Sequence, residues 1–222
     1  MHLVLKKLPL VLCLWTFYFI LLYLNQVMSM IIDALAKRIE DFIVAHMEEV
    51  DSIKIETIRY GIKVFLINAY KIPIIFITAY LLGIFKYAVI AYICFGSLRT
   101  FAGGIHAERG IACIISSMII LYSPAYLSPY LDRNYNIALF IITFIIIALY
   151  SPSDTRKKPI KSYKLKADLK ADSILIVVII FAASCLLPKD ISGVMVVSMF
   201  FESLLVLPIT YKIFGKERSS YA

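Results

Sequence analysis

Residues 137–150, IALFIITFIIIALY, contain no charged side chain, and this stretch decides the fold class. Similar runs occupy residues 174–187 and 191–207, in which Glu202 is the only charge. Hydrophobic residues make up 61% of the 222-residue chain and charged residues only 17%. Soluble domains are usually near half apolar with about a quarter of their residues charged. The composition and the runs together predict an all-α, polytopic integral membrane helical bundle.

The apolar runs indicate about six membrane spans. Residues 62–98 are too long a stretch for one span, because about 20 residues cross the hydrocarbon core. Gly83 and Lys86 fall near the middle of this stretch and divide it in two. The expected spans cover residues 62–82, 86–98, 110–126, 136–150, 172–187 and 191–213.

A different pattern precedes the spans. From residue 31 to 50 the apolar residues recur at spacings of three and four, and charged residues occupy the other face. This spacing predicts an amphipathic helix at the cytoplasmic face over residues 30–56, lying on the membrane surface or against a partner. Residues 1–28 form a hydrophobic segment that either belongs to the protein or reflects the assigned start, since Met28 and Met30 immediately precede the helix.

The net charge is +8, but the Lys and Arg residues concentrate in short loops beside the apolar runs and do not form a soluble basic face. Nucleic acid is therefore not an expected partner. Cytoplasmic loops of membrane proteins are enriched in Lys and Arg. The loop over residues 156–170 holds seven basic residues and one acidic residue, Asp168, which places it in the cytoplasm. A membrane bundle is expected over residues 57–214. Counting spans from this loop puts the residue 106 region of the bundle, and the tail at 215–222, in the cytoplasm.

Polar, reactive and glycine residues gather in one stretch, residues 99–113, RTFAGGIHAERGIAC. In one continuous helix, His106 and Cys113 would be separated by about 10.5 Å along the axis, too far for proton transfer. Gly103, Gly104 and Gly110 permit a turn that would bring the histidine back. If a helix begins near Gly110, Cys113 lies in its first turn, where free backbone N–H groups favour a thiolate.

The residue pattern alone leaves other interpretations open. A Cys in an apolar helix is usually packed, a loop His is usually solvated, and Glu108 either orients His106 or is solvated. Arg99 is either a charge anchor at the end of an apolar run or a substrate-binding group. No zinc site, disulfide framework or cofactor site is indicated, and the remaining cysteines are expected to serve packing: Cys13, Cys94 and Cys185.

The stretch RTFAGGIH with a Cys seven residues after the His resembles the signature of the accessory gene regulator B (AgrB) family, membrane peptidases of Gram-positive bacteria. The resemblance covers residues 30–214, including the approach to the first span at 58–61 and the loop sequence KKPI at 157–160. It implies a Cys113 and His106 dyad. It also implies substrate-binding or structural support from the following residues: Arg99, Gly103, Gly104, Glu108, Arg109, Lys157 and Lys158.

The resemblance further implies a quorum-sensing function in the bacterial cell membrane, with the active site facing the cytoplasm. Cys113 would cleave near the C-terminal part of an AgrD-like pheromone precursor, form a thioester and promote closure of a thiolactone or lactone ring. A homodimer in the lipid bilayer is expected. Two rivals remain: a small transporter using Lys71 and Arg99 as pathway charges, and a non-enzymatic scaffold that docks partners through residues 31–56.

Overall fold

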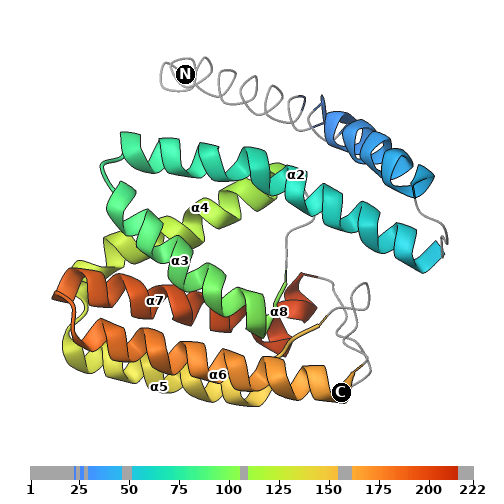
Figure 1. Ribbon diagram of the computed structural model, residues 1–222. Helices are drawn as coiled ribbons and strands as arrows, with labels where there is room; N and C mark the ends of the chain where they lie inside the picture. Colours follow the sequence, from blue (N-terminus) through green and yellow to red (C-terminus); the bar gives the residue numbers. More distant parts are fainter. Residues whose placement is uncertain are drawn as a thin grey trace, which may run out of the picture. The chain divides into compact units, whose positions relative to one another are not determined.

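The computed structural model describes residues 23, 26–27, 30–46, 52–105, 110–154 and 162–214 (Figure 1). In this part of the chain the regular structure is helical, with one isolated bridge between Gly103 and Ser153. A helix covers residues 30–45, and the other elements follow in order: α2 (Ser52–Leu81), α3 (Phe85–Ala102), α4 (Gly110–Leu127), η1 (Ser128–Tyr130), α5 (Arg133–Tyr150), α6 (Tyr163–Cys185), α7 (Lys189–Val206) and α8 (Pro208–Ile213). The predicted all-α class is confirmed for the described residues.

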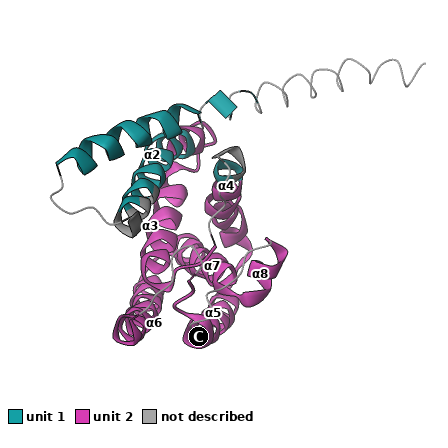
Figure 2. Cartoon of the chain, turned by 90° about the vertical axis from the view of Figure 1, so that its right-hand side faces the viewer, with its two compact units in different colours: residues 1–75, 107–115 teal, residues 76–106, 116–222 magenta. Residues whose placement is uncertain are grey.

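The chain divides into two compact units, coloured separately in Figure 2. The first unit comprises residues 1–75 and 107–115, and therefore holds the helix at 30–45, most of α2 and the start of α4. The second comprises residues 76–106 and 116–222. The stretch at 99–113 thus contributes its beginning to one unit and its end to the other.

Helix α7 is the centre of the second unit. It packs against α3, α5, α6, α8 and η1. Its Gly193 lies so close to η1 that an added Cβ would sit 2.9 Å from the Ser128 Cβ. Small residues allow this close approach, as is usual where helices pack without water between them. The buried core around α7 consists of Leu98, Ala102, Ile147, Val177, Val196, Met199 and Val206.

Two of the described helices are long and apolar enough to cross a membrane, over Gly61–Leu81 and Arg133–Tyr150. On α5 an outward-facing stripe recurs every four residues, and its members are all exposed: Ile137, Ile141, Ile145 and Leu149. Such a stripe suits contact with lipid better than contact with water. Charged residues lie within other predicted spans, as Lys86 and Glu202 do, or directly beside them, as Arg99, Lys189 and Asp190 do. The number of six spans therefore stays a prediction.

The division of the long apolar stretch at Gly83 is confirmed. Helix α2 ends at Leu81 and α3 begins at Phe85. Between them Gly83 adopts a φ of 70°, and the Ile84 N–H donates to the Ala79 carbonyl at 3.0 Å. This is the usual way for a glycine to close a helix end.

Two element boundaries differ from the prediction. The expected span at 191–213 is broken at Leu207, whose backbone is extended (φ −64°, ψ 138°), because Pro208 disfavours helical geometry in the residue before it. The expected amphipathic helix at 30–56 ends at residue 45, and residues 52–56 belong to α2. The apolar spacing continues through both helices, so periodicity did not mark the boundary.

Candidate functional site

The segment after α3 turns sharply at two glycines. Gly103 and Gly104 have φ values of 75° and 112°, a region that side-chain-bearing residues rarely adopt. The Gly103 N–H donates to the Arg99 carbonyl at 3.1 Å, and the Ser153 N–H donates to the Ala102 carbonyl at 2.8 Å. The Ile105 N–H reaches the Leu205 carbonyl at the end of α7, at 3.3 Å. Backbone bonds therefore fix a turn at Gly103 and Gly104, and the return of His106 toward Cys113 stays a prediction.

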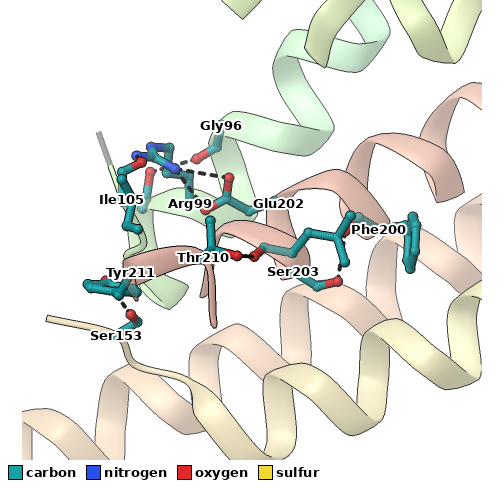
Figure 3. A network of polar contacts seen from close by, with 11 residues as sticks. Gly96, Arg99, Ile105, Ser153, Phe200, Glu202, Ser203, Thr210 and Tyr211 are labelled. Carbon is teal, nitrogen blue, oxygen red and sulfur yellow. Dashed lines mark hydrogen bonds and ion pairs between the residues drawn. The ribbon is translucent and has the colours of Figure 1, made fainter. Parts of the chain in front are cut away.

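The Arg99 side chain holds the same segment from within the second unit (Figure 3). Its Nη1 donates to both carboxylate oxygens of Glu202, at 3.2 and 3.1 Å, and its Nη2 donates to the Ile105 carbonyl. Glu202 is fully buried, and the Arg99 side chain is 23% exposed. The guanidinium also lies 5.6 Å from the centre of the Phe95 ring. Arg99 thus fixes the carbonyl group immediately before His106 in the chain.

Helix α8 closes this network. The Thr210 hydroxyl donates to the Leu204 carbonyl at 2.6 Å, and the Tyr211 hydroxyl is hydrogen-bonded to Ser153. Tyr211 is almost completely buried. The break at Leu207 therefore brings the last helix back against the segment that carries the Gly103 bridge.

Cys113 lies in the first turn of α4, because the described helix begins at Gly110. This is the position expected from the sequence. Its side chain is 3% exposed. In the same compact unit, the Lys71 Nζ of α2 lies 3.7 Å from the Cys113 Sγ, close enough for a hydrogen bond to sulfur. Lys71 is also buried, with 9% of its surface exposed.

The model of the family described as "Accessory gene regulator B" matches residues 31–206. The chain belongs to this family. An AgrB-like protein of Clostridium acetobutylicum is 34% identical over 178 residues, which cover 79% of this chain and 84% of that protein. The accessory gene regulator protein B of Staphylococcus lugdunensis is 28% identical over 190 residues, covering 84% and 99%. That of Staphylococcus intermedius is 29% identical over 154 residues, covering 68% and 81%. No solved structure is significantly similar to the chain.

Several residues that the AgrB resemblance singles out lie outside the described part of the chain. They are His106, Glu108, Arg109, Lys157 and Lys158. Residues 1–22, 24–25 and 28 of the hydrophobic segment at 1–28, and the tail over 215–222, also lie outside it. The roles of these residues remain predictions.

Two of the cysteines outside the signature lie in the described part of the chain, and Cys13 does not. Cys94 is 4% exposed within α3, as expected for a packing residue. Cys185, for which packing was also expected, is exposed at the end of α6. Position within an apolar run does not reveal which face of the helix a side chain occupies, and this explains the wrong prediction.

A groove of about 600 Å³ opens in the second unit, between the N-terminal parts of α5 and α7 and the C-terminal end of α6. Its lining includes Asp132, Asn136, Phe140, Phe181 and Ser192, and none of the residues predicted for the AgrB site.

Sequence reasoning missed two partners of the predicted residues, Glu202 and Lys71. A signal was present for both, because each is an ionisable residue inside an apolar run, and such residues face protein or water and find partners. What the sequence did not give was the pairing. Glu202 lies 103 positions from Arg99, and Lys71 lies 42 positions from Cys113.

Proposed function

We propose that this chain is a membrane-embedded cysteine endopeptidase that processes a quorum-sensing pheromone precursor. The observation that carries the proposal is Cys113 at the start of α4, within the signature RTFAGGIHAERGIAC of a chain that belongs to the accessory gene regulator B family. Relatives named accessory gene regulator proteins support a function in that regulatory system. The peptidase chemistry is our inference from the residues.

In the first step, the Cys113 thiol gives its proton to His106 and the thiolate attacks the carbonyl carbon of the scissile peptide bond. The C–N bond then breaks, and the leaving amine takes the proton from His106. Cys113 remains as an acyl thioester. The first-turn position supports this role, because the unpaired N–H groups and dipole of a helix start stabilise negative charge.

In the second step, a thiol or hydroxyl of the bound peptide attacks the thioester carbonyl. His106, now neutral, takes the proton of the attacking group, a thiolactone or lactone ring forms, and Cys113 leaves as a thiolate. A thioester suits this step because it retains acyl-transfer potential that direct hydrolysis would discard. No bound cofactor enters either step.

Arg99 and the two glycines have a supporting function in this scheme. They hold the backbone up to Ile105, and His106 follows directly in the chain. Glu108, Arg109, Lys157 and Lys158 are proposed to support the site or to attract an acidic precursor tail. The proposed setting is a multi-pass bundle at residues 57–214 in the bacterial cell membrane, with the site and tail in the cytoplasm, the helix at residues 30–45 on that face, and a second copy as partner.

The rival transporter hypothesis requires Lys71 and Arg99 to line a pathway. Their contacts count against it, because Arg99 is bound to Glu202 and Ile105 and Lys71 contacts Cys113. A transporter and a scaffold both predict that Cys113 is dispensable for processing.

The test is cleavage of the cognate precursor, co-expressed with the chain in a heterologous host. At equal membrane levels we expect Cys113→Ala and His106→Ala to abolish cleavage, and Cys94→Ser to retain it. Cleavage that survives both of the first two substitutions would exclude a cysteine peptidase and leave transport or scaffolding.

A further inference from the structure

A buried lysine faces the candidate nucleophile. Lys71 and Cys113 both belong to the first compact unit, and Nζ and Sγ are 3.7 Å apart. Lys71 is at the midpoint of the apolar helical stretch Gly61–Leu81. The contact therefore joins a cation in the middle of a predicted span to the first turn of α4.

A buried ammonium is costly unless a counter-charge or strong acceptors surround it. Two other cations of this unit have carboxylate partners, since Arg59 pairs with Glu40 and Lys63 pairs with Asp33. Within the described residues, the hydrogen bond found for the Lys71 Nζ goes to the Cys113 sulfur. A neutral thiol is a weak acceptor, whereas a thiolate supplies a full negative charge.

We infer that Lys71 is a third catalytic residue, whose ammonium stabilises the Cys113 thiolate and fixes the position of its sulfur. The inference rests on the proposed peptidase function. An opposite charge within about 4–6 Å favours the charged form of an ionisable group, typically by one to three pH units. Among the described titratable groups, Tyr70 also interacts with Cys113. His106, Glu108 and Arg109 precede α4 in the chain and lie outside the described residues.

The same charge acts on both chemical steps. When the thiolate attacks, its negative charge passes to the carbonyl oxygen and then to the leaving group, so the thioester sulfur is neutral and Lys71 loses its counter-charge. Ring closure restores the thiolate beside the ammonium. Lys71 therefore makes the Cys113 thiolate a better leaving group in ring closure. Loss of Lys71 slows ring closure as well as cleavage.

The experiment measures alkylation of Cys113 by iodoacetamide as a function of pH, on the full chain in detergent. Alanine replaces Cys13, Cys94 and Cys185, which leaves Cys113 as the only thiol. The variants are Lys71→Met, Lys71→Arg and, as a control with the same charge change on the same helix, Lys63→Met. Burial of Cys113 lowers the plateau rate in all of them, but the pH of half-maximal rate reports the thiolate alone.

Lys71→Met is expected to raise the half-maximal pH by roughly one unit or more, and to slow alkylation at pH 6.5 about tenfold. Lys63→Met and Lys71→Arg are expected to keep the parent value. An unchanged half-maximal pH in Lys71→Met overturns the inference, even if cleavage is lost, because a merely structural lysine would behave in that way.

If Lys71→Met does not fold, Lys71→Gln, which removes the charge and keeps a polar group, takes its place with the same expected rise in half-maximal pH. An unchanged half-maximal pH in Lys71→Gln overturns the inference. Failure of the proposed function has a different signature, namely precursor cleavage by Cys113→Ala.

Discussion

Arg99 joins a buried carboxylate to the backbone before His106, and its removal affects both. Arg99→Met leaves the fully buried Glu202 without its cation. Breaking a buried pair on one side costs about 3–5 kcal/mol. We expect this loss in the free energy of unfolding in detergent. The double variant Arg99→Met/Glu202→Met should recover more than half of it, since no uncompensated charge remains. Arg99→Met with parental stability would show that the pair is not formed.

The backbone at Gly103 gives a second prediction. A Cβ at this position would collide with the Ser153 carbonyl, and the φ of 75° already disfavours any side chain. Gly103→Ala should therefore destabilise the turn by about 1–3 kcal/mol and lower precursor cleavage. Gly96→Ala, within α3, is the matched control, because its Cβ would meet nothing within 4 Å beyond the backbone of its own helix. Equal precursor cleavage by Gly103→Ala and Gly96→Ala would contradict the close approach of Gly103 to Ser153.

At the residue scale, the sequence predicted local backbone features better than it predicted contacts between distant side chains. The turn glycines, the position of Cys113 and the importance of Arg99 follow from local spacing and motif. The Arg99 to Glu202 and Lys71 to Cys113 contacts do not, because residues far apart in the chain meet only once the helices have packed.

The helix at residues 30–45 is held to α2 by two ion pairs of unequal burial. The Glu40 side chain is 5% exposed and accepts two hydrogen bonds from Arg59, whereas Asp33 and Lys63 are 56% and 39% exposed. Exposed pairs contribute little. We expect Glu40→Gln to lower the hydrogen-exchange protection of residues 30–45, and the control Asp33→Asn to leave it nearly unchanged.

The same helix should respond to acid. The hydrogen bonds from Arg59 hold the pKa of Glu40 below its ordinary value. A lowered carboxyl pKa gives stabilisation that is complete above the unfolded-state pKa, about 4.3, and is lost as the pH falls through the folded-state pKa. Protection of residues 30–45, corrected for intrinsic exchange, should therefore fall on acidification below about pH 4 in the parent. If acid lowers the protection of residues 30–45 no more in the parent than in Glu40→Gln, Glu40 is not the group responsible.

At the element scale, apolar periodicity predicted where helices occur and left some of their ends undetermined. It divided α2 from α3 correctly because Gly83 supplies a local signal. It joined α7 to α8 because both are apolar, although Pro208 marks the break. The periodicity also did not predict which apolar side chains are buried. Leu35, Ile39 and Phe42 lie on the predicted apolar face and are exposed, whereas Ile32 on the same face is buried. Which part of an apolar face meets protein depends on neighbouring helices.

For the whole molecule, the charge distribution predicts a topology. In a cysteine-free background, Lys164→Cys should be labelled by a membrane-impermeant maleimide only after lysis, because we propose that the basic loop is cytoplasmic. Asp132→Cys should be labelled in intact cells. Asp132 is suited to replacement, since its pair with Lys189 is mostly exposed. Labelling of both, or of Lys164→Cys alone, in intact cells would overturn the proposed orientation.

In the proposed mechanism, Cys113 carries the peptide between cleavage and ring closure. The most direct measurement is intact-mass spectrometry of the purified chain after incubation with a precursor whose ring-closing Cys or Ser is replaced by Ala, so that the second step cannot occur. We predict a covalent adduct with the mass of the N-terminal cleavage fragment, removable by neutral hydroxylamine, present in Cys94→Ala and absent in Cys113→Ala. Cleavage without an adduct in the parent, or an adduct that persists in Cys113→Ala, would contradict the account.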